Sequence, residues 1–341
     1  MTKKIITILG ARPQFIKASS VSKSLIDYGL EEIIINTGQH YDYNLSDIFF
    51  SELNIPNANY NLNVGSSSHA SQTSKIMSLL EPILIDEKPN FVILYGDTNS
   101  TLGGALVCAK LHIPIVHIEA GLRSFNKLMP EEINRLITDH VSSILFVPSM
   151  QSIKNLEKEN ICDGVYNSGD VMYDIFCRFE NSFNLSHKFN NYSLLTLHRA
   201  ENTVENTLKI RLDQIREIDE EVIFPIHPRT KKIISSLDIK IPSNLKIIDP
   251  VGWFELMGLI NGANYIFTDS GGMQKEAFWH KKLCYTLRNE TEWVETVEQG
   301  ANFIISENEN INLSIDINSN FRNPYGDGDA SEKIANFLNK L

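Results

Sequence analysis

The sequence has few cysteines and no long hydrophobic run. Its four cysteines lie far apart, without the C-x-x-C spacing of a zinc or redox motif: Cys108, Cys162, Cys177 and Cys284. Neither a disulfide framework nor a zinc site is indicated, so a reducing compartment fits best. The apolar stretch after Met1 is too short for a signal peptide, and no segment reaches the roughly 18 apolar residues of a spanning helix. We expect a soluble, cytoplasmic protein without a membrane partner.

Positive charge is also scarce. Lys and Arg number 31 against 42 Asp and Glu, which gives a net charge of −11 without long blocks of one sign. This balance argues against a general nucleic-acid or membrane-surface binder. The sequence has no G-x-G-x-x-G and no Walker A motif, which disfavours a dinucleotide or a P-loop triphosphate. Any anionic ligand must therefore be held by a local site.

What the sequence does have is a regular alternation of short β-branched runs with stretches of helical period. The first half contains five predicted strands: Ile5–Leu9, Ile33–Asn36, Phe91–Tyr95, Ile115–Ile118 and Ile144–Val147. The pattern lapses over Asp163–Asn191 and then restarts with five more: Ser193–Leu197, Val222–Ile226, Leu245–Ile248, Tyr265–Thr268 and Leu283–Thr286. The alternation predicts an α/β fold with two Rossmann-like, doubly wound domains. Ligands of such sheets bind beyond the carboxyl ends of the strands, so we expect a cleft shared by the two domains.

The turn after the first strand is a candidate anion site. Gly10–Lys17 places Arg12 and Lys17 around the start of a helix. Free backbone N–H groups, the helix dipole and two cations would suit a phosphate or a carboxylate. Lys17 taken alone fits a solvated helix lysine equally well, and Arg12 is the better candidate of the two.

Three carboxylates follow in the same half. Asp97 comes after the third predicted strand, Glu119 ends the fourth beside His117, and Glu131 lies in the first turn of a helix. Three of these residues also have an ordinary structural interpretation: Asp97 as a helix cap, Glu131 as a first-turn acid and His117 as a hydrogen-bonded core histidine. Carboxylates converging from adjacent strand ends can raise one pKa enough for proton abstraction. A metal cluster is the competing use, but no typical metal-ligand spacing supports it.

The second half offers a candidate diphosphate site. His198 and Arg199 follow the strand Ser193–Leu197, and His227 follows the next strand. A glycine turn opens a helix after Tyr265–Thr268, and it consists of Ser270, Gly271 and Gly272. Its N–H groups and the serine hydroxyl would receive a diphosphate, and Glu276, further along the helix, could accept from the two hydroxyls of a ribose.

Taken together, these residues resemble the non-hydrolysing UDP-N-acetylglucosamine 2-epimerases, enzymes with the two-Rossmann-domain GT-B architecture. The resemblance spans nearly the whole chain: Gly10–Lys17, Thr37–His40, Gly96–Thr98, His117–Arg123, Pro130–Arg135, Ser168–Asp170, His198–Asn202, His227-Pro228, Asp269–Glu276, Leu287–Glu292 and Asn323–Gly328. It implies four catalytic positions: Asp97, Glu119, Glu131 and His198. It implies a substrate and UDP site made of Arg12, Lys17, Arg199, His227, Ser270, Gly271, Gly272, Glu276 and Arg288.

The resemblance also implies an organisation and a reaction. The N-terminal domain is expected at 1–170 with a returning C-terminal helix at 330–341, and the UDP-binding domain at 171–329. The family eliminates UDP to form a 2-acetamidoglucal and adds it back, without a metal or other cofactor. It also implies a homodimer, a UDP-sugar substrate and a role in surface polysaccharide synthesis.

Departures from the family pattern bear on the substrate. Ala11 and Gln14 replace residues of the usual G-T-R-P-E, and Trp293 ends a segment that usually reads T-T-E-R-P. These variants resemble the branch acting on UDP-2,3-diacetamido-2,3-dideoxy-glucuronic acid in O-antigen synthesis. Gln39 and His40 match residues that contact an activating second UDP-sugar in bacterial relatives, but the segment at 65–69 differs, which puts such activation in doubt.

Three other readings of the sequence remain. A hydrolysing 2-epimerase would release free ManNAc, although its first loop usually reads differently. A GT-B glycosyltransferase could share the architecture but would not need three converging carboxylates. A catalytically inactive nucleotide-sugar sensor would have no use for the intact set Asp97, Glu119, Glu131 and His198.

Overall fold

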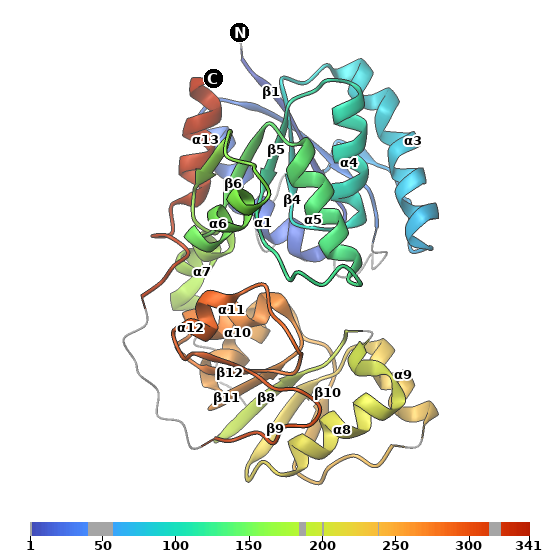
Figure 1. Cartoon of the computed structure of the whole chain (residues 1–341), viewed down its shortest axis with the longest axis vertical. Helices are drawn as coiled ribbons and strands as arrows, with labels where there is room; N and C mark the ends of the chain where they lie inside the picture. The colour runs from blue at the N-terminus through green and yellow to red at the C-terminus, as the bar shows by residue number, and fades with distance from the viewer. Residues whose placement is uncertain (1, 40–56, 184–188, 200, 238, 314–321) are drawn as a thin grey trace. The chain divides into compact units, whose positions relative to one another are not determined.

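The computed structural model describes residues 2–39, 57–183, 189–199, 201–237, 239–313 and 322–341. The chain divides into two compact units (Figure 1). Unit 1 comprises Met1–Arg178 with Pro324–Leu341, and unit 2 comprises Phe179–Asn323. Among the described residues, no helix has both the length and the apolar character needed to cross a bilayer.

Unit 1 contains a seven-stranded parallel sheet in the order β3-β2-β1-β4-β5-β6-β7. Its strands are β1 (Lys4–Leu9), β2 (Glu31–Asn36), β3 (Tyr60–Asn61), β4 (Phe91–Tyr95), β5 (Ile115–Ile118), β6 (Ile144–Val147) and β7 (Val165–Asn167). Its helices are α1 (Arg12–Asp27), α3 (His69–Glu87), α4 (Asn99–Lys110), α5 (Pro130–Val141), α6 (Met150–Lys158), α7 (Val171–Phe179) and α13 (Ala330–Lys340). The strand order reverses direction between β1 and β4, which makes the carboxyl ends of these two strands the switch point where such sheets bind ligands.

Unit 2 contains a six-stranded parallel sheet in the order β10-β9-β8-β11-β12-β13. Its strands are β8 (Tyr192–Thr196), β9 (Glu221–Pro225), β10 (Leu245–Ile248), β11 (Tyr265–Thr268), β12 (Leu283–Thr286) and β13 (Asn302–Ile304). Its helices are α8 (Glu205–Arg216), α9 (Pro228–Ser236), α10 (Trp253–Gly262), α11 (Gly271–Trp279) and α12 (Val294–Glu298). Here the switch point lies between β8 and β11. The expected fold class, two Rossmann-like α/β domains, is confirmed.

The strands form where the sequence offers continuous β-branched and aliphatic runs, because a parallel strand is buried on both faces. In β1 the five residues from Ile5 to Leu9 are all buried, and in β5 and β6 every residue is. Each sheet has its own core. Leu94 and Ile76 belong to the core of unit 1, and Phe224 and Phe267 to that of unit 2.

The last helix, α13, belongs to unit 1 although it is far from α1 in sequence. It packs beside α1 (Figure 1). Its Phe337 ring also lies against Tyr166 of β7, with 4.3 Å between ring centroids. The Asp174 carboxylate on α7 accepts hydrogen bonds from the first backbone N–H groups of α13, those of Ala330 (3.0 Å) and Ser331 (2.6 Å). These bonds satisfy donors that a helix start otherwise leaves unpaired.

Candidate functional site

In unit 1, Gln14 ties together the two turns at the switch point. Its Oε1 accepts from the backbone N–H groups of Gly10 (2.8 Å) and Ala11 (3.1 Å), at the start of α1. Its Nε2 donates to the Tyr95 carbonyl (2.8 Å) at the end of β4 and to the Thr101 hydroxyl (3.0 Å) on α4. An amide fits here because one end of the side chain must accept and the other must donate. The carboxyl ends of β1 and β4 are therefore held in one arrangement.

Lys17 and Glu119 form an ion pair beside Gly96. The Lys17 ammonium contacts the Glu119 carboxylate, and Lys17 is only 8% exposed, so the solvated-lysine reading is wrong. Glu119 has a φ of +69°, a left-handed conformation that costs a non-glycine residue about 1–3 kcal/mol and is often found at functional sites. Gly96 has a φ of +60°, and a Cβ there would lie 3.1 Å from Glu119 Oε2. The turn after β4 therefore leaves room for the pair because residue 96 is glycine.

Asp97 is held by α5 and is not the cap of α4. Its Oδ2 accepts from Arg135 Nη2 (2.6 Å) and Nε (3.0 Å), and its carbonyl accepts from Asn134 (2.8 Å). Thr98 caps α4 instead, with its hydroxyl accepting from the N–H of Thr101. Because 30% of the Asp97 side chain stays exposed, this carboxylate is fixed in orientation but still open to a ligand.

The first turn of α5 carries two glutamates in different surroundings. Glu132 is 1% exposed and accepts from the backbone N–H groups of Ser124 (2.9 Å) and Phe125 (3.0 Å). It also accepts from Arg135 Nη1 (3.0 Å), so it helps to hold the guanidinium that contacts Asp97. Glu131, the predicted catalytic residue, is half-buried in the same turn. Sequence reasoning did not find the structural role of Glu132.

His117 is a hydrogen-bonded core histidine, which agrees with its structural interpretation from the sequence. The ring is fully buried, with Nδ1 at 2.6 Å from Asp139 Oδ1 and Nε2 at 2.8 Å from the Gly96 carbonyl. Burial alone would raise the pKa of Asp139, but the neighbouring charges of His117 and Arg123 hold it below its usual value. The outcome is a fixed Gly96 peptide just before Asp97.

Of the two residues expected at a regulatory site, Gln39 contacts the start of α4. Gln39 is buried, and its Oε1 accepts from the backbone N–H (2.9 Å) and the hydroxyl (2.7 Å) of Ser100. Its side-chain oxygen is thus engaged within unit 1. His40 lies outside the described residues.

In unit 2, Asp269 organises the turn that carries His198 and Arg199. Its buried carboxylate accepts from the backbone N–H of His198 (3.0 Å) and of Arg199 (2.9 Å). It also accepts from Asn202 Nδ2 (3.2 Å). The His198 side chain stays 45% exposed at this switch point.

The glycine turn of unit 2 opens α11 as predicted. Ser270 is the residue before the helix, and Gly272 has open space where a Cβ would be. At Gly271, by contrast, a Cβ would meet Glu292 Oε1 at 2.4 Å. Glu292 pairs with Arg288 (2.9 Å) and faces Arg199 (3.8 Å). The helix N-terminus and two arginines are therefore gathered near one carboxylate, an arrangement able to bind an anion.

Three further predicted site residues are Glu276, Arg12 and His227. Glu276 is buried on α11 and accepts from the indole N–H of Trp253 (3.2 Å). Arg12 is half-buried in the first turn of α1, and His227 is exposed just before α9. Glu276 thus has a fixed orientation.

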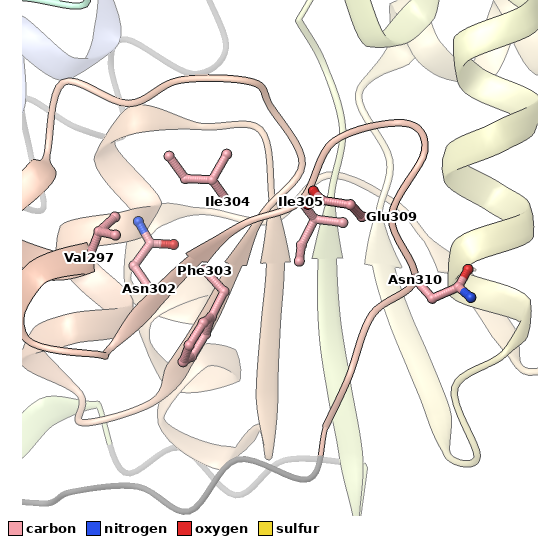
Figure 2. Close-up of a pocket in the computed structure, with 7 residues that line it drawn as sticks. All are labelled: Val297, Asn302, Phe303, Ile304, Ile305, Glu309 and Asn310. Atoms are coloured by element: carbon pink, nitrogen blue, oxygen red, sulfur yellow. The ribbon is translucent and has the colours of Figure 1, made fainter.

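A pocket of about 570 Å³ lies elsewhere in unit 2, at the edge strand β13. Figure 2 shows its lining side chains: Val297, Asn302, Phe303, Ile304, Ile305, Glu309 and Asn310. None of the predicted site residues lines it. In the part of the chain that the structure describes, no group of three or more His, Cys, Asp or Glu side chains could hold a metal ion.

The chain is similar to known proteins over nearly its whole length. The family model for UDP-N-acetylglucosamine 2-epimerase matches residues 25–339. A Methanococcus maripaludis protein named UDP-N-acetylglucosamine 2-epimerase homolog is 48% identical, over 99% of this chain and 100% of that protein. The UDP-2,3-diacetamido-2,3-dideoxy-D-glucuronate 2-epimerase of Pseudomonas aeruginosa is 45% identical with the same coverage. The crystal structure of Methanocaldococcus jannaschii UDP-GlcNAc 2-epimerase with UDP-GlcNAc and UDP aligns with a TM-score of 0.92 and 40% identity, over 99% of this chain and 100% of that one.

Proposed function

This chain belongs to the UDP-N-acetylglucosamine 2-epimerase family, and from that premise we propose a non-hydrolysing UDP-2-acetamido-sugar 2-epimerase that interconverts UDP-GlcNAc and UDP-ManNAc. The observation that carries this proposal is the cluster around Gly96. There, Asp97 and the Lys17–Glu119 pair lie together at the switch point of unit 1. A pair of carboxylates with different partners is suited to acid and base work on one carbon.

We assign the acid and base chemistry to the N-terminal domain (1–170 with 330–341). Asp97, Glu119 and Glu131 supply the proton acceptor and donor. Lys17 lies next to the reacting sugar, and Arg12 binds the nucleotide. The geometry that supports these roles is the fixed Asp97 carboxylate and the enclosed ion pair of Glu119.

We assign UDP binding to the domain 171–329. The N–H groups of Ser270, Gly271 and Gly272 receive the diphosphate, because a helix N-terminus favours an anion. Glu276 accepts from the ribose hydroxyls. The basic side chains around this turn stabilise the departing diphosphate: His198, Arg199, His227 and Arg288.

The reaction follows from the chemistry of the substrate. The C2–H bond of the sugar is not acidic, so its proton leaves as the C1–O bond to UDP breaks. The electron pair of the C2–H bond then forms the C1–C2 double bond of a 2-acetamidoglucal, and UDP carries away the electrons of the C1–O bond. Return of a proton to the opposite face of C2, with addition of UDP at C1, gives the epimer.

The test is turnover of UDP-GlcNAc in D₂O. We expect deuterium at C2 of the product, and complete retention of the original hydrogen would exclude this route. Separation of UDP-ManNAc, free ManNAc, UDP and glycal distinguishes the alternatives, because a hydrolysing enzyme accumulates ManNAc and a sensor produces nothing. Glu119→Gln and Asp97→Asn should each lower turnover by orders of magnitude in protein that still unfolds cooperatively.

A second substrate is supported by a specific observation. The Pseudomonas aeruginosa relative acts on UDP-2,3-diacetamido-2,3-dideoxy-D-glucuronate by name and is 45% identical. A panel comparing kcat/KM for this nucleotide sugar and UDP-GlcNAc decides which is the physiological substrate. For either one, we propose a cytosolic homodimer whose product enters surface polysaccharide synthesis. Gln39 and His40 remain the proposed contacts for a regulatory UDP-sugar.

A further inference from the structure

The Asp269 carboxylate in unit 2 faces donors on both of its oxygens. Oδ2 accepts from the backbone N–H of His198 (3.0 Å), the backbone N–H of Arg199 (2.9 Å) and Asn202 Nδ2 (3.2 Å). Oδ1 faces the same His198 backbone N–H (3.2 Å) and, at 3.4 Å, the ring nitrogen His198 Nδ1. Backbone and amide N–H groups can only donate, so the carboxylate is oriented by three bonds that do not involve the imidazole.

This orientation favours one tautomer of the His198 imidazole. An ionised carboxylate only accepts hydrogen bonds, so Oδ1 at 3.4 Å favours the tautomer whose hydrogen is on Nδ1. The His198 side chain is 45% exposed, which leaves the ring open to a ligand. Arg211 lies behind the carboxylate, where its Nε donates to Asn202 Oδ1 (3.2 Å), and its charge acts on Asp269.

We propose that Asp269 is a positioning residue for His198. It keeps the proton of the neutral ring on Nδ1 and presents Nε2 to the UDP-sugar. A hydrogen-bonding partner on one ring nitrogen sets what the other nitrogen can do. The effect of Asp269 on turnover rests on the proposed function, because it requires that His198 acts on the substrate. The effect of Asp269 on the tautomer of His198 does not depend on that function.

The variant Asp269→Asn reverses the hydrogen-bonding pattern without changing the size of the side chain. Its single oxygen must occupy the position of Oδ2, where three donors converge. The amide NH₂ then faces His198 Nδ1, which must become an acceptor. The proton of the neutral ring therefore moves to Nε2. In serine proteases the corresponding change leaves the geometry intact and lowers kcat by about 10⁴-fold.

The direct experiment is long-range ¹H–¹⁵N NMR of the histidine rings in the ¹⁵N-labelled full chain, at a pH where the ring is neutral. The His198 signals are assigned by their loss in His198→Gln. We expect a protonated Nδ1 in the wild type and a protonated Nε2 in Asp269→Asn. A wild-type ring protonated on Nε2 would by itself overturn the proposal, even if Asp269→Asn failed to fold.

Asp174→Asn is the matched control. Asp174 is also a buried aspartate that accepts two backbone N–H groups, but it lies in unit 1. Its variant should leave the His198 signals unchanged. In turnover of UDP-GlcNAc, Asp269→Asn should reduce kcat at least about tenfold more than Asp174→Asn does. A changed ring with equal turnover supports the positioning role and refutes the assignment of His198 to the reaction. An unchanged ring refutes the positioning role whatever the turnover.

Discussion

Arg135 donates two hydrogen bonds to the carboxylate of Asp97, with Nη2 at 2.6 Å and Nε at 3.0 Å from the same oxygen. Its third nitrogen, Nη1, donates to Glu132 Oε2 at 3.0 Å. A guanidinium can make these contacts at once because its N–H groups point outward in a rigid plane. Arg135 therefore joins a partly exposed acid at the end of β4 to a buried acid on α5.

Arg135→Lys tests this connection. A single ammonium on a flexible stem cannot reproduce the fork, so we expect kcat to fall at least about tenfold and the free energy of unfolding to fall by about 1–3 kcal/mol. Arg216→Lys is the control, because Arg216 pairs with Asp213 on an exposed helix face, where such pairs contribute little. Steady-state kinetics and urea unfolding measure both effects. Equal kinetics in the two variants would contradict a role for Arg135 in holding Asp97.

Gly96→Ala should separate backbone strain from crowding of the Lys17–Glu119 pair. An alanine at a φ of +60° costs about 1–2 kcal/mol, and its Cβ would lie 3.1 Å from Glu119 Oε2. Gly29 has a similar φ of +72°, but nothing lies within 4 Å of a Cβ there. We expect both variants to lose similar stability and only Gly96→Ala to lose most of its turnover. Similar kinetics in both would show that the pair tolerates a methyl group at residue 96.

The central strands could be predicted from sequence because parallel strands are buried on both faces and read as continuous apolar runs. The observed bounds of β4, β5 and β6 coincide with the predicted ones. The edge strands β3, β7 and β13 were not predicted, since each is only two or three residues long. Such short edge segments carry no periodicity to detect.

The site could be predicted only in part. Strand ends identify Asp97 and Glu119, because position along a strand is a local property. Their partners are set by tertiary packing: Arg135 is 38 residues from Asp97, and Lys17 is 102 residues from Glu119. No local sequence pattern predicts these two ion pairs. For Asp269, the Ser-Gly-Gly turn drew attention to the helix that follows, whereas its carboxylate faces back to the turn after β8.

Glu32→Gln should stabilise unit 1 at alkaline pH. Burial raises the pKa of Glu32 in spite of the hydrogen bond from Thr7. The folded state thus prefers the protonated acid, and this stabilisation is complete below the unfolded pKa and is lost as pH rises through the folded pKa. A neutral glutamine avoids that loss, so the variant should exceed the wild type in melting temperature at pH 8 and lose this advantage near pH 4. Glu31→Gln, on the exposed neighbour in β2, should show no such trend. A trend shared by both variants would contradict the buried-acid explanation.

Acid should destabilise unit 2 through His280. Burial, followed by the charge of Lys282, lowers the pKa of this histidine to about 4. The neutral ring packs against Phe183 at 5.5 Å between centroids. Because the folded pKa lies below the unfolded one, the stabilisation is complete above the unfolded pKa and is lost as pH falls toward about 4. The full effect is about 3 kcal/mol.

All three tryptophans lie in unit 2, so fluorescence during urea unfolding reports on that unit. From pH 7 to pH 4.5 the wild type should lose stability steeply. His280→Asn should lose less over the same interval, because it has no buried imidazole to protonate. His112→Asn, at an exposed position with a φ of +56° that asparagine tolerates, should follow the wild type. If His280→Asn kept the full wild-type slope, another group would have to carry the acid sensitivity of unit 2.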